Sequence, residues 1–209
     1  MKESASTEPA SDVAFTPSVK AVQERRGSRR MFERMEGRGG WSSTITPDLV
    51  AFIANVRSFY FATASKDGQP YMQHRGGPPG FLRVLDEKRL AFVDFTGNRQ
   101  YITTGNLAEN PRAFIFFMDY VRRRRVKLWG TAEAIEDDPE LTRSLFPGGY
   151  SAEPVQAIIF TLTAFDRNCA QHIPKLLPAE EVEAALEALH GRIATLQAEL
   201  DTLRSGTGC

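Results

Sequence analysis

Apolar and polar residues change their spacing along the chain, and the spacing predicts helices near both ends with strands between them. In "TPDLVAFIANVRSF" the apolar residues recur at helical spacing, with Thr46 as a cap and Pro47 in the first turn. From Phe59 onward the pattern is that of strands, and Asp67-Gly68 between two strand-like segments is typical of a hairpin turn. The middle of the chain is therefore predicted to be mainly β.

Short turns join most of the predicted strands. "FLRVL" and "RLAFVDF" indicate a second hairpin, while "QYITTGNLAENP" and "DDPELTRSLF" indicate short helices. Longer strand patterns occur in "RAFIFFMDY", "RRRRVKLWGTAEAI" and "PVQAIIFTLTAFDRNC", which brings the prediction to about six strands. Because short turns join antiparallel neighbours, the predicted fold is α+β and mainly β, an antiparallel barrel with short flanking helices.

The C-terminal segment has another period. Its apolar residues are spaced alternately by four and three, the pattern of a coiled-coil seam. They are Val182, Leu186, Leu189, Ile193, Leu196, Leu200 and Leu203. We expect a long helix whose apolar stripe either packs on its own barrel or pairs with another subunit, and which Gly191 weakens by about 1 kcal/mol relative to alanine.

Four parts are expected along the chain. Residues 1–16, rich in Ser, Ala, Glu and Pro, indicate a flexible arm. Residues 17–46 indicate a charged helical extension broken at Gly27. The barrel is expected over residues 47–177 and the heptad-patterned helix and tail over residues 178–209.

Composition excludes several classes of protein. The chain has 209 residues, 42% of them hydrophobic and 14 of them Phe, which suits one packed domain with extensions. A formal net charge of zero argues against nucleic-acid or membrane binding through bulk charge. The N-terminus does not resemble a signal peptide, and no apolar run approaches the roughly 18 residues of a membrane span. With Cys169 and Cys209 as the only cysteines, we expect a cytoplasmic protein.

The basic segment has two faces when it is extended as a strand. One face is apolar and is predicted to lie in the core: Val126, Leu128, Gly130, Ala132 and Ala134. The other face carries the cations and a tryptophan: Arg123, Arg125, Lys127, Trp129 and Thr131. Neighbouring cations repel unless an acid or an anion compensates them. This face is either a solvated exterior or a wall at a subunit interface and an anionic ligand.

Two clusters of polar residues follow strands. "GNRQ" ends a strand and opens a helix, so that backbone N–H groups and the helix dipole favour an anion there. Arg99 can hold phosphate with two hydrogen bonds, and Asn98 and Gln100 add donors. His74 and Arg75 end another strand before a glycine-rich turn. Both clusters are interpreted as either ordinary turns or two sides of an anion site.

The histidines do not indicate a metal. His74, His172 and His190 share no metal-ligand spacing with cysteine or carboxylate residues, and no nucleophile-elbow motif is present. We therefore predict no metal site and disfavour hydrolytic chemistry.

The order of motifs is more specific than any one of them. "FATASKDGQPYMQHRG", "LAFVDFTGNRQYITTGNLAENPRAFIFF" and "RRRVKLWGTAEAI" together resemble the pyridoxamine 5′-phosphate oxidase-like flavoproteins over roughly residues 47–172. "QHRGGPPGF" and "NCAQHI" resemble the related branch of that family. The resemblance implies a six-stranded antiparallel split barrel that binds FMN and works as a homodimer.

The resemblance also implies roles for single residues. The flavin phosphate is expected at Asn98, Arg99 and Gln100. The strand end expected along the flavin and its phosphate is Gln73, His74 and Arg75. The basic strand is expected to reach a cofactor held mainly by the other subunit through Arg125 and Lys127. The segment expected to close over the flavin contains Gln171 and His172.

Residue chemistry extends this interpretation. Trp129, Phe95 or Tyr101 can cover the flavin ring, and a cation such as Arg75 or Lys127 would stabilise the reduced, anionic ring. His74 and His172 are candidate proton donors, since imidazole titrates near neutral pH.

The tail departs from the family, because it lacks the segment rich in arginine and tryptophan that holds pyridoxamine phosphate in the true oxidases. We therefore predict an FMN-dependent oxidoreductase for another small molecule. One alternative is a non-catalytic flavin- or haem-binding module, with His74, His172 or His190 as a haem ligand. A nucleic-acid surface around Trp129 and its neighbouring arginines is the third hypothesis, which zero net charge disfavours.

Overall fold

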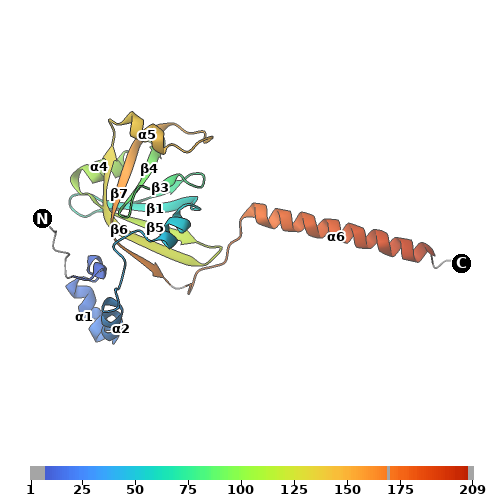
Figure 1. The fold of residues 1–209 in the computed structure, drawn as a ribbon, viewed down its shortest axis with the longest axis horizontal. Helices are drawn as coiled ribbons and strands as arrows, with labels where there is room; N and C mark the ends of the chain where they lie inside the picture. Colours follow the sequence, from blue (N-terminus) through green and yellow to red (C-terminus); the bar gives the residue numbers. More distant parts are fainter. Residues whose placement is uncertain (1–7, 169, 207–209) are drawn as a thin grey trace. The chain divides into compact units, whose positions relative to one another are not determined.

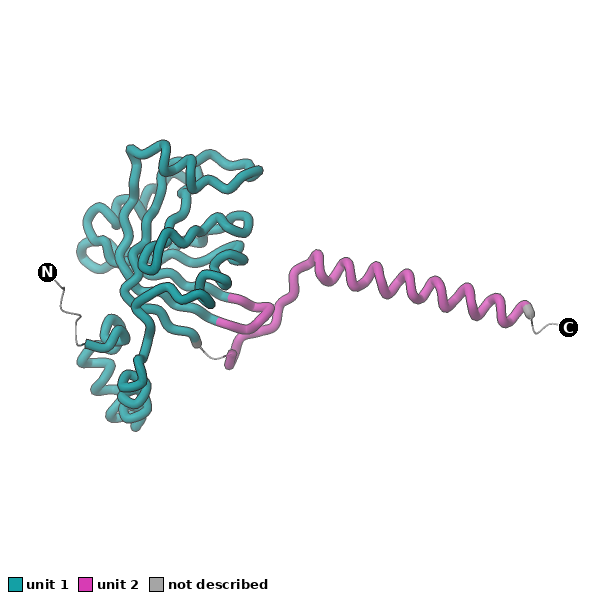
Figure 2. The backbone as a smooth tube through the Cα atoms, in the orientation of Figure 1, with its two compact units in different colours: residues 1–118, 125–169 teal, residues 119–124, 170–209 magenta. Residues whose placement is uncertain are grey.

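The computed structural model describes residues 8–168 and 170–206, so that Cys169 and Cys209 lie outside the described residues. The chain divides into two compact units (Figure 2). Unit 1 contains residues 1–118 and 125–169, and unit 2 contains residues 119–124 and 170–209. Unit 1 carries the barrel, and unit 2 carries the C-terminal helix.

One sheet forms the body of unit 1 (Figure 1). Its strands are β1 (Ser58–Ala64), β2 (Pro70–Gly76), β3 (Leu82–Val84), β4 (Arg89–Phe95), β5 (Arg112–Asp119), β6 (Arg124–Ile135) and β7 (Pro154–Asn168). They follow the order β2-β1-β5-β6-β7-β4-β3. The pairs β1–β2, β1–β5, β3–β4, β4–β7 and β6–β7 are antiparallel. The fold is α+β and mainly β, as predicted, and the sheet curls into a half-barrel. It has seven strands, one more than the count of about six. All seven lie in segments predicted as strands, and the short β3 lies within "FLRVL", which pairs with β4 as the predicted hairpin.

The described residues also form helices, and several of them start at predicted signals. They are η1 (Ala10–Val13), α1 (Pro17–Arg25), α2 (Arg29–Glu36), α3 (Pro47–Ile53), α4 (Ile102–Glu109), α5 (Pro139–Leu145) and, in unit 2, α6 (Ala179–Gly206). Thr46 Oγ1 accepts a hydrogen bond from the Leu49 amide at 3.4 Å, which caps α3 as predicted. Gly27, at φ +76°, separates α1 from α2. Within the range expected to be a flexible arm, η1 buries Ser11, whose hydroxyl donates to Glu36 Oε1 at 3.1 Å.

The barrel core is built from alternate residues of the strands. Its largest fully buried side chains include Phe59, Phe61, Phe92, Phe117 and Phe160. Strand β6 has the two faces that its sequence predicts, since Val126 and Leu128 are buried while Lys127 and Trp129 are half-buried on the other side. Gly130 marks a close approach of strands, because a Cβ atom there would overlap the carbonyl oxygen of Thr161.

The N-terminal extension covers part of the outer face of β6. The rings of Trp41 and Trp129 stack with centroids 4.6 Å apart and an interplanar angle of 18°. Phe15, which precedes the extension, packs on Trp41 at 5.1 Å and on Phe32 at 5.0 Å, so that the three rings form one aromatic cluster. Trp129 therefore has an aromatic partner within its own chain.

Unit 2 consists of a turn, a short extended segment and α6. Arg123 lies in the turn with a positive φ of 54°, and its guanidinium donates to the carbonyl oxygens of Ile173 at 2.9 Å and Ala170 at 3.2 Å. Arg123 thus precedes β6 rather than sharing the cationic face of the strand. The long predicted helix is present as α6, 28 residues in length. None of the helices in the described part of the chain has both the length and the apolar character needed to span a membrane.

Candidate functional site

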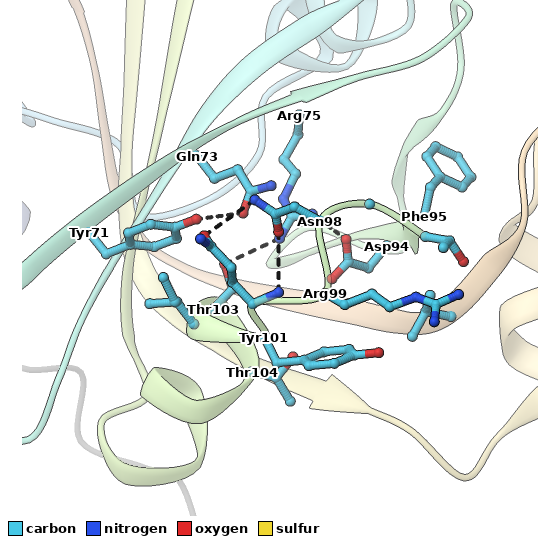
Figure 3. Close-up of a pocket in the computed structure, with 15 residues that line it drawn as sticks. Tyr71, Gln73, Arg75, Asp94, Phe95, Asn98, Arg99, Tyr101, Thr103 and Thr104 are labelled. Atoms are coloured by element: carbon cyan, nitrogen blue, oxygen red, sulfur yellow. Dashed lines mark hydrogen bonds and ion pairs between the residues drawn. The ribbon is translucent and has the colours of Figure 1, made fainter.

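A pocket of about 170 Å³ lies where β2, the end of β4 and the start of α4 meet (Figure 3). It is lined by Tyr71, Gln73, Arg75, Asp94, Phe95, Thr96, Gly97, Asn98, Arg99, Gln100, Tyr101, Ile102, Thr103, Thr104 and Val155. Arg75 from one of the two polar clusters and "GNRQ" from the other therefore line the same pocket, whereas His74 does not line it. Pockets that bury a whole drug-sized ligand measure roughly 300–1,000 Å³, so this one can enclose only part of a larger ligand.

Strand β2 supplies one side of the pocket through its alternation. Tyr71, Gln73 and Arg75 are half-buried and face the pocket, whereas Met72 and His74 are exposed on the opposite face. The Tyr71 hydroxyl donates to Gln73 Oε1 at 2.9 Å. This bond orients the Gln73 amide, so that its NH₂ group is available to a ligand.

The loop between β4 and α4 supplies the other side and has an unusual backbone. Arg99 and Tyr101 have positive φ values of 57° and 51°, which non-glycine residues rarely adopt. Such conformations cost of order 1–3 kcal/mol each and are concentrated at functional sites. Asn98 stabilises the loop through two hydrogen bonds to Gln100. Its Oδ1 accepts from the backbone N–H of Gln100 at 3.2 Å, and its Nδ2 donates to the side-chain Oε1 of Gln100 at 3.2 Å.

Helix α4 begins at the pocket without a side-chain cap. Its N-cap residue is Tyr101, whose side chain caps none of the first N–H groups. The uncapped N–H groups and the helix dipole favour an anion at this end. Asn106 Nδ2 donates to Thr63 Oγ1 at 3.0 Å and thereby fixes α4 to β1.

Arg75 is held by a polar network. Its guanidinium forms an ion pair with Asp94 and donates to Thr103 Oγ1 at 3.2 Å. Gln156, which is only 2% exposed, donates to Asp94 Oδ2 at 3.1 Å and to Thr104 Oγ1 at 2.8 Å. The side chains of Arg75 and Asp94 are themselves only 12% and 14% exposed. The network fixes the position of both charges at the wall of the pocket.

The Arg75 Nε atom is buried, and no described residue accepts a hydrogen bond from it. Buried donors are satisfied in most proteins, and an unsatisfied one costs about 1–3 kcal/mol. This orphaned donor is an observation that a ligand at the pocket would explain.

The Arg75–Asp94 pair also joins distant parts of the sheet. Strand β2 is at one end of the strand order, and β4 is next to the other end. No backbone ladder within the described residues connects these two strands, and the side-chain ion pair bridges them instead. The pocket therefore lies where the two ends of the curled sheet approach each other.

Several predicted residues of unit 1 lie outside the pocket in their own chain. The exposed His74 ring packs against Tyr60 at 5.8 Å. Lys127 Nζ lies 3.6 Å from Asp166 Oδ2 and 5.8 Å from the centroid of Trp129. Arg125 is on the same face of β6. Their predicted roles toward the cofactor stay predictions that require a second subunit.

Gln171 and His172 belong to unit 2, and His172 has a positive φ of 59°. Their predicted placement over the cofactor stays a prediction. No group of three or more His, Cys, Asp or Glu side chains within residues 8–168 and 170–206 is arranged to hold a metal ion.

Sequence reasoning missed part of the site: Tyr71, Asp94, Thr103, Thr104 and Gln156. Tyr71 could have been found, since it precedes Gln73 by two residues on the same face of a predicted strand. Gln156 contacts Asp94 only through the pairing of β4 with β7, which no local pattern specifies.

The family assignment comes from the barrel. Residues 45–165 match the sequence profile described as pyridoxamine 5′-phosphate oxidase, which is more than half of the chain. The chain belongs to the pyridoxamine 5′-phosphate oxidase family. The match spans α3, all of β1 to β6 and most of β7, and includes every residue that lines the pocket. The resemblance to this family that the sequence motifs indicate is therefore confirmed. No curated protein matches the chain.

Several solved structures are similar to this chain. A HupZ protein of Group A Streptococcus is 21% identical, with 64% of this chain and 99% of that chain covered, at a TM-score of 0.49. An FMN-binding protein of Syntrophomonas wolfei is 12% identical, with 79% and 100% covered, at 0.45. A pyridoxamine 5′-phosphate oxidase-related, FMN-binding protein of Nostoc punctiforme is 15% identical, with 53% and 73% covered, at 0.37. The family assignment depends on the profile match and not on these likenesses.

Proposed function

We propose that the pocket binds FMN and that the protein is an FMN-dependent oxidoreductase for a small molecule other than pyridoxamine phosphate. The observation that carries the proposal is the convergence of hydrogen-bond donors from β2 and from the strained loop before α4 on one pocket. Bound FMN would supply the electron-transfer chemistry, while the protein supplies binding and electrostatics.

Charge decides which end of the pocket suits the phosphate. Asp94 compensates the charge of Arg75, whereas no carboxylate in the described part of the chain pairs with Arg99. A dianion is repelled by Asp94 and attracted to Arg99, so the phosphate belongs at the Arg99 end. Asn98 and the uncapped start of α4 are available there as further donors. In Figure 3 the Arg99 side chain extends away from Tyr71 and Gln73, which separates the two ends.

The β2 side of the pocket suits the polar chain or ring edge of the flavin. Gln73 presents an oriented amide, and the buried Nε of Arg75 would gain the acceptor that it lacks. Carbonyl and hydroxyl oxygens of FMN can supply that acceptor. Phe95 and Tyr101 line the same pocket and offer ring surface. The donor set therefore fits FMN.

A homodimer is part of the proposal, because the pocket of one chain is smaller than the ligand. An aromatic outer face supports this part. On neighbouring strands, Tyr60 lies 6.4 Å from Phe116, and Phe114 lies 5.0 Å from Trp129. Met72, on the same side of β2 as His74, is 61% exposed. A second copy seated on this face would cover it and bring Arg125 and Lys127 toward a shared cofactor.

The proposed proton donors depend on that dimer. His74 is on the face of β2 opposite Gln73 and Arg75, so it can act only on a ligand that approaches from that face. His172 is in unit 2 and stays a candidate.

The experiment compares FMN with riboflavin, which lacks the phosphate, on Arg99→Ala. Loss of a hydrogen bond to a charged group costs about 1.5–3 kcal/mol. We therefore expect FMN affinity to fall by roughly 10- to 150-fold in a fluorescence titration while riboflavin affinity changes little. The matched control is Arg83→Ala, since Arg83 is exposed on β3 and does not line the pocket. Equal FMN affinity of Arg99→Ala and the unmodified protein would refute the phosphate assignment.

Oxidoreductase activity needs its own measurement. The purified protein, loaded with FMN, is mixed anaerobically with a nicotinamide donor, and the flavin absorption is followed. Bleaching of the flavin bands, restored by an electron acceptor, supports catalysis. A stable haem band in place of flavin bands would favour the binding-module hypothesis.

A further inference from the structure

Helix α6 has charged residues beside its apolar heptad stripe, which is called the seam. Counting from the seam, the heptad core positions are Leu186, Ile193 and Leu200 at a, and Val182, Leu189, Leu196 and Leu203 at d. These seven side chains are 40–72% exposed. Seven apolar side chains along one stripe at that exposure need a cover, and the charges beside the stripe indicate what covers it.

The glycine of α6 lies on the face of the helix opposite the seam. Gly191 falls at position f, the position most distant from the seam, and a Cβ atom there would meet nothing within 4 Å. The glycine therefore weakens the helix without leaving a hole between paired helices.

The residues beside the seam distinguish parallel from antiparallel pairing. In a parallel pair, each g residue faces the e residue five positions on in the partner. That arrangement gives the contacts Ala185–His190, Arg192–Gln197 and Glu199–Arg204, of which one joins opposite charges.

In an antiparallel pair, residues at position e face residues at position e of the partner helix, and residues at position g face residues at position g. When Leu186 packs against Leu203 of the other copy, Ile193 packs against Leu196 and Leu189 against Leu200, so that six complete core layers form. The flanking contacts are then Arg192–Glu199 and Glu183–Arg204, each occurring twice by symmetry, with neutral His190–Gln197 between them. Both charged contacts are attractive.

The same charges exclude the neighbouring antiparallel registers. A shift of one heptad in one direction sets Arg192 against Arg192 of the second copy. A shift in the other direction sets Glu199 against Glu199. Like charges facing each other destabilise a pair, so one register combines a full core with attractive flanks.

We propose that α6 pairs with α6 of a second copy as an antiparallel two-stranded coiled coil, with its twofold axis between residues 194 and 195. The occupant is a second copy because the stripe and its flanking charges are complementary to themselves when one helix is reversed. Helix α6 supplies none of the residues that line the pocket, so the proposal stands whether or not FMN is the ligand.

Disulfide mapping tests the orientation in the full-length chain. Cys169 and Cys209 are first replaced by serine, and Leu186→Cys and Leu203→Cys are introduced together. Antiparallel pairing predicts the cross-link from 186 to 203 of the other copy, identified by peptide mass spectrometry. Leu203→Cys alone should not cross-link, because residues 203 of an antiparallel pair lie ~26 Å apart along the axis. Cross-links from 186 to 186 or from 203 to 203 would overturn the proposal, as would the absence of any cross-link.

Charge reversal tests the register with the same cross-link as readout. Arg192→Glu turns two attractive contacts into two repulsive ones, and the initial rate of the 186–203 cross-link should fall roughly tenfold. Arg192→Glu combined with Glu199→Arg should restore the rate. Glu187→Arg, a charge change of the same size at an outer position, should leave the rate unchanged. Failure of the double variant to recover would overturn the register, because parallel pairing predicts that Glu199→Arg sets two cations against each other at positions 199 and 204.

Discussion

Removal of Asp94 tests whether the network behind the pocket stabilises the barrel. Asp94→Ala leaves the Arg75 guanidinium without its carboxylate in a site where the two side chains are 12% and 14% exposed. Breaking one partner of a buried ion pair costs about 3–5 kcal/mol, and the residual exposure places this pair near 3 kcal/mol. Gln156 also loses an acceptor, which adds about 1 kcal/mol. The sum is a large part of the ~5–15 kcal/mol that keeps a typical domain folded.

The assay is urea unfolding of the full-length protein at neutral pH, without added flavin. Arg75→Met combined with Asp94→Leu should cost only about 1 kcal/mol, because neither charge is then left uncompensated. The control is Asp48→Asn, since the Asp48–Arg167 pair is 83% and 45% exposed and should contribute less than ~1 kcal/mol. A cost of Asp94→Ala equal to that of Asp48→Asn would refute the reasoning. In the double variant, FMN binding should weaken although the fold is retained, because the guanidinium group of Arg75 is missing from the wall of the pocket.

Two further predictions concern the strands. Gly130→Ala should destabilise the barrel by about 3 kcal/mol in the same unfolding assay, because its Cβ would overlap the Thr161 carbonyl oxygen; Gly105→Ala, with open space around it, is the control that should not destabilise. The backbone N–H of Lys88 donates to Asp86 and is the main cause that lowers the pKa of Asp86 below its ordinary value of 3.8. Asp86 therefore stabilises the fold above pH 3.8 and loses that effect as the pH falls through its lowered pKa; an NMR titration that gives 3.8 or higher would contradict this.

Local sequence patterns predicted the elements well where the signal is chemical and short. The Thr46-Pro47 helix start, the turn at Gly68 and the break at Gly27 all depend on neighbouring residues. The heptad spacing predicted α6 for the same reason. Strand β3 was predicted as one arm of a hairpin because a short polar turn separates two apolar segments, although the count of about six strands was one too low.

The site was predicted in part, for a physical reason. Arg75 and Arg99 could be named because Arg75 ends one predicted strand and Arg99 follows another, each with polar neighbours, and both line the pocket. The interaction of Arg75 with Asp94 depends on how the curled sheet closes, which is a long-range property. Trp129 was predicted to cover a flavin ring, and its indole stacks on Trp41 in the same chain. An aromatic side chain on a strand face does not specify whether its partner is a ligand or the chain itself.

The closure of the half-barrel by an ion pair has a consequence for the rate at which a ligand leaves. Among the described residues no backbone ladder pairs β2 with β4, and the Arg75–Asp94 ion pair joins them instead. The residence time of a bound molecule should therefore depend on how often that ion pair opens. A ligand that accepts a hydrogen bond from Arg75 Nε would also keep the Arg75–Asp94 ion pair closed. Occupancy should then slow amide hydrogen exchange along β2, far more than in the central strands, and dissociation should accelerate when salt loosens the pair.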